Sequence, residues 1–128
     1  FALALYLWSL GEALPKVSKL KSRFKEAWSI LETECQSCHQ GDDLAGEGVP
    51  IESVGTDPAV GQSSARGTGE YRIPSLRGVG TRGALMNDGS IKSFNDLLNP
   101  ARQDSAHRFG LSLDAKQRDQ LIQLLNHL

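Results

Sequence analysis

The feature that most constrains this chain is the run Cys35-Gln36-Ser37-Cys38-His39, which contains both of its cysteines. Three chemistries use such a close pair: disulfide exchange, zinc binding and covalent attachment of haem. A structural zinc site needs four ligands, usually with a second Cys or His pair at similar spacing. The other histidines, His107 and His127, stand far apart in the sequence. The sequence therefore gives little support to a zinc site.

The position of the cysteine pair also disfavours disulfide exchange. A thioredoxin-like site places Cys-x-x-Cys after a buried strand, at the beginning of a helix, whereas Cys35 ends a predicted helix and a Gly/Asp-rich stretch follows His39. Covalent haem attachment accounts for all three residues. The two sulfurs form thioethers with the haem vinyl groups, and the adjacent imidazole becomes an axial ligand of the iron. We therefore expect one haem c, bound through Cys35 and Cys38, with His39 on the iron.

Length and charge fit a small domain of this kind. The 128 residues suffice for one domain with a modest core. The net charge is -1 and the basic residues are scattered, so nothing indicates binding to nucleic acid or to an anionic membrane surface. Because c-type haem is attached outside the cytoplasm, we expect a periplasmic or otherwise extracytoplasmic location.

The opening stretch, FALALYLWSL, is almost entirely apolar. It lacks an initiator Met, a basic region and a small-x-small cleavage site, which mark a signal peptide, and it is too short to span a bilayer. We expect a helix in residues 1–15, amphipathic or buried and acting as the tail of a preceding domain, and a haem domain in residues 16–128. No membrane span is predicted.

Helical periodicity is clearest near the two ends of the haem domain. From Lys16 to Leu31, apolar residues recur at helical spacing and predict a helix that leads into the cysteine motif. Near the C-terminus, Asp114 and Gln117 have the spacing of a capping box, and an apolar stripe follows as far as Leu128. These patterns predict a first and a last helix packed on a common core.

The middle of the chain is harder to assign. Residues 40–70 are rich in Gly and Pro without sustained periodicity, so we expect a long Gly-rich loop that covers the haem edge. A shorter helix is expected to begin at Ser90, bury Phe94 and end at Asn99-Pro100. Together these features predict an all-α domain around one haem.

This order of features resembles class I cytochrome c: a helix ending in Cys-x-x-Cys-His, a Pro-x-Leu-x-Gly run at residues 74–78, a middle helix, a ligand loop and a last helix. The segments YRIPSLRGVGTRGALMNDGSIKSFNDLL and HRFGLSLDAKQRDQLIQLLNHL are more closely similar to the C-terminal haem domain of the bacterial di-haem cytochrome c peroxidase superfamily. Two positions depart from that superfamily: Asn87 replaces a usual His, and the loop before the last helix has no Met. Both departures argue against peroxidase activity.

The sixth ligand of the iron has two candidates. Met86 is the only methionine, and thioether ligation is common in electron-transfer cytochromes, but Met86 precedes the middle helix. His107 follows that helix and stands about where the resemblance places the family's methionine. We favour coordination by His39 and His107, with Met86 as the alternative and an open site as the third.

The resemblance also implies a set of residues around the haem. The carbonyl of Pro74 should accept a hydrogen bond from Nδ1 of His39, and Leu76 should pack on the haem face. The haem propionates are expected to contact the guanidinium groups of Arg77 and Arg82 and the phenol of Tyr71.

The expected function is single-electron transfer by a six-coordinate haem, with redox proteins as donor and acceptor and no catalysis by this chain. Two alternatives stay open. In one, the chain is the electron-relay domain of a di-haem peroxidase or oxidase, and a preceding haem domain is its partner. In the other, it is a haem-based sensor or small-gas binder, which requires an open or displaceable sixth ligand.

Overall fold

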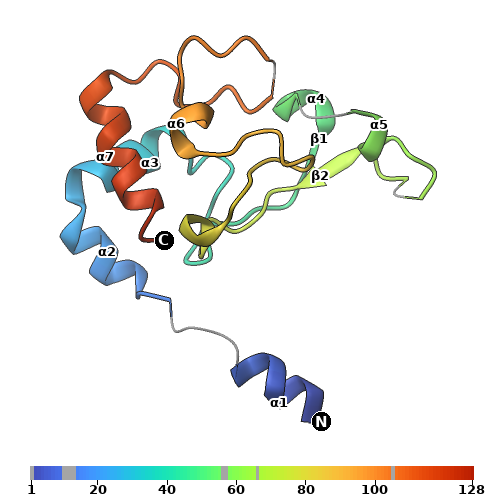
Figure 1. The fold of residues 1–128 in the computed structure, drawn as a ribbon, viewed down its shortest axis with the longest axis horizontal. Helices are drawn as coiled ribbons and strands as arrows, with labels where there is room; N and C mark the ends of the chain where they lie inside the picture. Colours follow the sequence, from blue (N-terminus) through green and yellow to red (C-terminus); the bar gives the residue numbers. More distant parts are fainter. Residues whose placement is uncertain (1, 10–13, 56–57, 66, 105) are drawn as a thin grey trace.

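The elements, in chain order, are α1 (Ala2–Ser9), α2 (Val17–Arg23), α3 (Lys25–Glu34), β1 (Gly48–Pro50), α4 (Ile51–Val54), α5 (Pro58–Gly61), β2 (Glu70–Arg72), the 3-10 turn η1 (Val79–Thr81), α6 (Phe94–Leu97) and α7 (Ala115–Leu125). The computed structural model describes residues 2–9, 14–55, 58–65, 67–104 and 106–128. Figure 1 shows α2, α3 and α7 gathered on one side, and the two strands with α4 and α5 on the other.

The core lies where α3 packs against α7. The side chains of Leu31, Leu121 and Leu124 are fully buried there. As the sequence predicted, α7 begins with a capping box: Gln117 N donates to the Asp114 carboxylate at 2.8 Å, and Asp114 N donates to the Gln117 side chain at 3.0 Å. Burial of apolar side chains on both helices therefore fixes the position of the cysteine motif that follows α3.

The helix predicted from Lys16 is divided in two. Most of its apolar stripe is buried, with Val17 and Phe24 only partly so, but the backbone breaks at Phe24, where φ is -118° and ψ is 48°. The ring of Phe24 lies 4.9 Å from that of His127, just beyond α7. The break thus lets α2 and α3 change direction while Phe24 packs beside the C-terminus.

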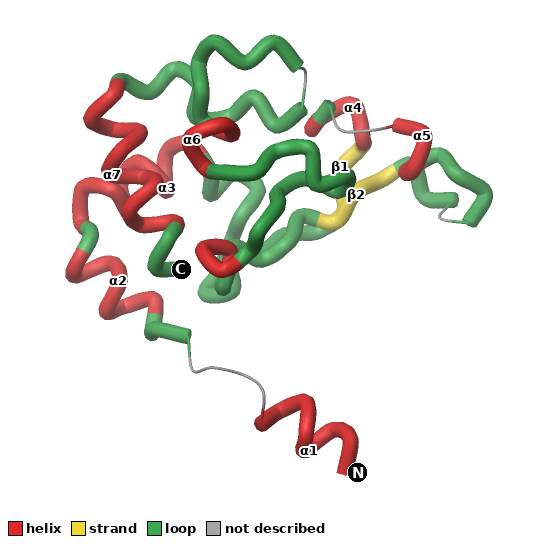
Figure 2. Tube along the Cα trace, viewed as in Figure 1, coloured by secondary structure: helices red, strands yellow, loops and turns green. Residues whose placement is uncertain are grey.

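The prediction of an all-α domain is wrong. Strand β1 pairs with β2 in a two-stranded antiparallel sheet, in the register Gly48–Arg72, Val49–Tyr71 and Pro50–Glu70. Figure 2 shows this pair in yellow, with the short helices α4 and α5 beside it. Three residues are too few to display the alternation of a strand, so periodicity gave no sign of the sheet. The described part of the chain is a small mixed domain of helices with one short sheet.

The two predictions for the middle of the chain also need correction. Residues 40–70 are not one continuous loop, because they contain β1, α4 and α5 and the start of β2. The middle helix is one turn only, and Phe94, which was expected to be buried, is only partly so. This helix is capped by Ser93 rather than Ser90, since the Ser93 hydroxyl accepts from Asp96 N at 3.0 Å, while Ile91 pairs with Leu85 in an isolated bridge.

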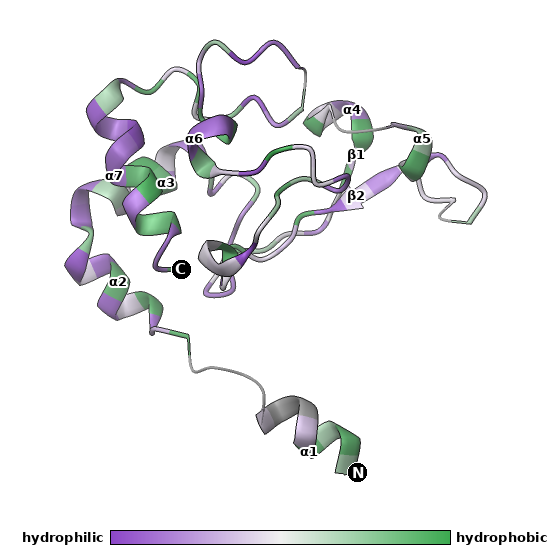
Figure 3. Ribbon diagram, viewed as in Figure 1, coloured by the Kyte–Doolittle hydropathy of each residue, from purple (hydrophilic) through white to green (hydrophobic). Residues whose placement is uncertain are grey.

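The apolar opening stretch forms a helix, but α1 covers only Ala2–Ser9 of the predicted residues 1–15, since residues 14 and 15 are not helical, and the prediction that it is buried is wrong. Figure 3 colours the N-terminal part of this helix as hydrophobic, and Figure 1 places it apart from the other elements. Its described side chains are not buried: Leu3 is 68% exposed and Tyr6 59%. Residues 10–13 lie outside the described part of the chain. None of the described helices has the length and apolar character needed to cross a membrane.

Leu31→Ala should lower the free energy of unfolding by about 2–5 kcal/mol, because it removes a fully buried side chain and leaves a cavity between α3 and α7. Urea denaturation followed by circular dichroism measures this. Leu3→Ala is the matched control, since that exposed leucine should change stability by less than about 0.5 kcal/mol. Equal effects of the two substitutions would contradict the described core.

Candidate functional site

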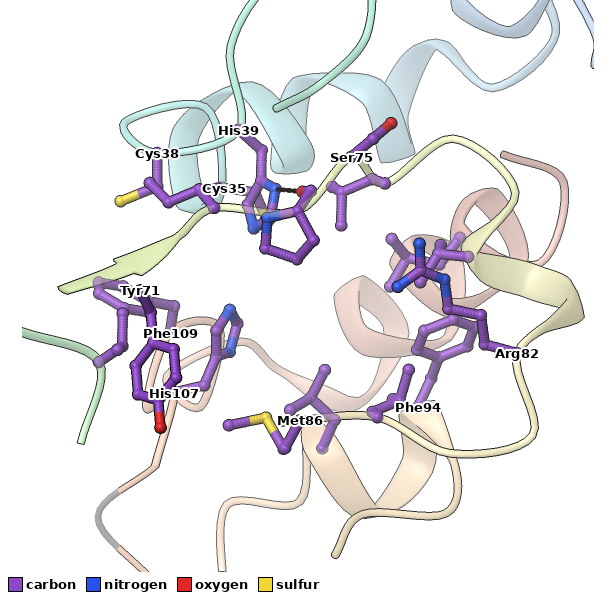
Figure 4. Close-up of a pocket in the computed structure, with 18 of the residues that line it drawn as sticks. Cys35, Cys38, His39, Tyr71, Ser75, Arg82, Met86, Phe94, His107 and Phe109 are labelled. Carbon is purple, nitrogen blue, oxygen red and sulfur yellow. Dashed lines mark hydrogen bonds between the residues drawn. The ribbon is translucent and has the colours of Figure 1, made fainter. Parts of the chain in front are cut away.

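A cavity of about 410 Å³ lies between the end of α3, the sheet and α7. This volume is within the range of about 300–1,000 Å³ typical of cofactor and ligand sites. Figure 4 shows its walls. Of the residues singled out from the sequence, all but Arg77 line it: Cys35, Cys38, His39, Tyr71, Pro74, Leu76, Arg82, Met86 and His107. Segments far apart in the chain thus converge on one space.

The end of α3 presents the cysteine motif to this cavity. Cys35 is the C-cap of the helix, and its carbonyl accepts hydrogen bonds from the backbone N–H groups of Cys38, at 3.2 Å, and His39, at 2.9 Å. The motif therefore forms one further turn beyond the helix. Both cysteines are free thiols and partly buried. They and His39 face the same cavity.

His39 is held in one orientation by two backbone carbonyls. Its Nδ1 lies 3.0 Å from the oxygen of Pro74, the contact expected from the sequence, and 3.1 Å from that of Leu44. Because carbonyl oxygens only accept, the Nδ1–H must donate to them, which leaves the lone pair on Nε2. The ring is 8% exposed. Its burial lowers the pKa of His39, so the imidazole is neutral, the form that coordinates metals.

His107 lies on the other side of the cavity and belongs to the segment before α7. Burial lowers the pKa of His107, and so do the facing ring of His39 and the guanidinium of Arg102. Its Nδ1 is buried without a hydrogen-bond partner among the described residues. A buried polar atom left unpaired is costly unless something else occupies the site. The imidazole of His107 therefore suits a bound group that contacts one of the ring nitrogens.

The two imidazoles face each other across the cavity (Figure 4). Their ring centres are 6.5 Å apart, and their planes are inclined by 56°. Metal–imidazole bonds of about 2.0–2.1 Å place two rings that share one metal about 6 Å apart, centre to centre. Among the described residues no group of three or more His, Cys, Asp or Glu side chains is arranged to hold a metal ion. The pair thus suits a metal that brings its remaining ligands with it, as haem iron does.

Backbone strain is concentrated at this site. Among the described residues, the non-glycine residues with positive φ are Leu44 at 49°, Met86 at 69° and His107 at 47°. Leu44 supports the ring of His39, and the other two line the cavity. A left-handed conformation at a non-glycine residue costs about 1–3 kcal/mol and persists where surrounding contacts impose it. Such strain is typical of functional sites.

Cys35 is not an activated thiol. Burial, together with the neighbouring Glu34 and Cys38, raises the pKa of Cys35 to about 12. Because the thiolate is the nucleophile in disulfide exchange, a thiol with so high a pKa is a poor redox catalyst. This agrees with the sequence-based argument against a thioredoxin-like site.

The three residues expected to bind propionates are not brought together. The Arg77 guanidinium lies outside the cavity lining, where its Nη2 donates to the carbonyl of Pro15 at 2.6 Å. Figure 4 shows Arg82 and Tyr71 at opposite ends of the cavity. The phenol oxygen of Tyr71 accepts a hydrogen bond from Nδ2 of Asn87 at 2.8 Å. Of the three, only Arg82 brings a positive charge to the cavity.

Met86 and Leu76 line the cavity as expected. Figure 4 shows Met86 across the cavity from His39, on the same side as His107. Leu76 is partly buried against the hydrophobic core, and its backbone N–H donates to the carbonyl of Leu44 at 3.1 Å. Both candidates for the sixth ligand therefore line the cavity, and the ring centre of His107 lies 6.5 Å from that of His39.

Sequence reasoning missed two contributors to the site. Leu44 was not foreseen as an acceptor for His39, because its role depends on a backbone conformation that no residue type signals. Phe109, whose ring meets that of His107 edge-on at 5.3 Å, was also missed. An aromatic residue two positions after the candidate ligand was the available clue.

Comparisons with known proteins do not identify the chain. No protein-family model matches it, and no curated protein or solved structure is similar enough to be matched.

Gly46→Ala should destabilise the protein by about 1–3 kcal/mol, because a Cβ there would lie 2.5 Å from the carbonyl oxygen of Cys38 and 3.0 Å from Cδ1 of Ile73. Urea denaturation is the measurement. Gly83→Ala is the matched control, since a Cβ at Gly83 meets nothing within 4 Å. Equal stability of the two variants would contradict the close contact between Gly46 and the carbonyl of Cys38.

Proposed function

We propose that this chain is an extracytoplasmic electron-transfer domain that carries one c-type haem, bound covalently through Cys35 and Cys38, with His39 and His107 as axial ligands. One observation supports this above all others. Two imidazoles, those of His39 and His107, lie with their ring centres 6.5 Å apart on opposite sides of a cavity whose wall also holds the cysteine pair.

The residues of the cavity fit the chemistry of a haem. The two thiols supply what two thioether bonds need, and His39 follows them directly in the chain. Apolar side chains from several elements complete the walls, including Val49, Ile73 and Leu125. Arg82 adds one cation for a propionate. When bound, the haem supplies an iron that cycles between ferric and ferrous states.

The protein's part in this function is to fix the ligands and exclude water. The carbonyls of Leu44 and Pro74 hold the tautomer of His39 and make its Nε2 more basic. A second nitrogen ligand favours a lower reduction potential than the thioether of Met86 would. If His39 and His107 both bound the iron, they would leave no position for a substrate, so the domain would carry electrons and not catalyse. Its partners are redox proteins that donate and accept one electron.

The covalent bond is the most direct test. Protein produced in a cell that attaches c-type haem should retain one haem after extraction with acid-acetone. The double variant Cys35→Ala/Cys38→Ala should lose all of it, because both thioether sulfurs are gone. Ser37→Ala, which changes one of the two residues between them, is the control and should keep its haem. Haem that resists extraction in the double variant, or its absence from the unmodified protein, would refute covalent attachment.

The sixth ligand is tested separately. His107→Ala should convert a low-spin ferric absorption spectrum into a high-spin or mixed one, because one strong-field nitrogen is removed. Met86→Ala should leave the spectrum low-spin and is the matched control from the same side of the cavity. The opposite pattern would assign the ligand to Met86. A high-spin spectrum of the unmodified protein would instead favour the haem-based sensor.

A further inference from the structure

The backbone conformation of His107 must be stabilised by contacts with other residues. Its backbone is left-handed, with φ at 47°, and such a conformation is unfavourable for a residue with a Cβ. No helix or strand contains it, because it lies between α6 and α7. Contacts with the rest of the protein must therefore select the conformation that directs its ring into the cavity.

Two hydrogen bonds hold the backbone of His107 on either side. Its N–H donates to the carbonyl of Val54, at the end of α4, at 2.7 Å. Its own carbonyl accepts from Nη2 of Arg102 at 2.8 Å. The first bond ties the segment to a neighbouring element. The second comes from a side chain five residues earlier in the same segment.

Arg102 is placed for this contact. Its side chain is only 8% exposed, whereas that of its ion-pair partner Asp104 is 50% exposed. Nη1 binds the Asp104 carboxylate and Nη2 binds the carbonyl of His107, so the planar fork of the guanidinium joins two points of the same segment. The Asp104 carboxylate also accepts from Ala106 N at 3.1 Å. Arginine is suited to this role because hydrogen bonds from a charged donor are stronger than neutral ones.

We propose that Arg102 is the positioning residue that holds His107 opposite His39. This inference rests on the proposed function. Arg102 does not line the cavity and acts through the backbone of His107. Without it, the segment relaxes from the left-handed conformation and the ring of His107 leaves its place across from His39. The identity of the sixth ligand would thus depend on a residue outside the lining of the cavity.

The test compares three variants of the haem-loaded protein: Arg102→Ala, Arg102→Lys and Arg118→Ala. Arg118 is the matched control, because its Nη1 also donates to a backbone carbonyl, that of Leu113 at 2.6 Å, without contacting His107. Lysine keeps one charged donor but cannot bind two acceptors in a fork. Circular dichroism verifies that each variant is folded.

Two readouts separate positioning from a general loss of stability. Hydrogen exchange of the His107 amide should become at least about tenfold faster in Arg102→Ala, because its bond to Val54 then opens more often. The low-spin fraction of the ferric spectrum should fall by at least half. Arg102→Lys should lie between Arg102→Ala and the unmodified protein, and Arg118→Ala should match the unmodified protein in both readouts.

The outcomes distinguish this inference from the proposed function. If the unmodified protein has a His/His spectrum and Arg102→Ala keeps it with unchanged amide exchange, Arg102 has no positioning role and the proposed function stands. If the unmodified protein has no His/His spectrum, the ligand assignment fails whatever Arg102 does. If Arg102→Ala does not fold, Arg102→Lys decides: spectra and exchange identical to those of the unmodified protein overturn the inference.

Discussion

The site depends first on the pair of hydrogen bonds from Nδ1 of His39 to the carbonyls of Leu44 and Pro74. The bond to Pro74 joins the turn after α3 to the segment after β2, which is distant in sequence, whereas the bond to Leu44 is made within the loop that follows the motif. They also fix the ring's tautomer, so that Nε2 carries the lone pair toward the cavity. Every other feature of the site is arranged around an imidazole whose orientation is already set.

The short sheet explains how Pro74 reaches His39. Pairing of β1 with β2 continues beyond the strands, because Ile73 N donates to the carbonyl of Glu47 and Gly46 N donates to that of Ile73, both at 3.2 Å. This ladder leads the chain past the cysteine motif, where only a glycine fits against the carbonyl of Cys38. The sheet thus positions the segment that follows β2, so that the carbonyl of Pro74 lies beside the ring of His39.

Local patterns were readable from the sequence, and long-range ones were not. The capping box of Asp114 and Gln117 and the buried stripe of α7 depend on residues a few positions apart, so spacing predicted both. The strands are three residues long and follow from pairing across more than twenty residues, which no local pattern records. For the site, the sequence predicted the cysteine motif and the hydrogen bond between His39 and the carbonyl of Pro74. The place of Arg77, by contrast, follows from a contact with Pro15 that only the fold creates.

Near-infrared magnetic circular dichroism of the ferric protein at neutral pH tests the central claim most directly. The energy of the charge-transfer band distinguishes iron with two imidazole ligands from iron with one imidazole and a thioether, and from five-coordinate iron. A spectrum of two imidazole ligands is the predicted result, because His39 and His107 face each other across the cavity. A spectrum of imidazole with thioether, or of high-spin iron, would contradict the account.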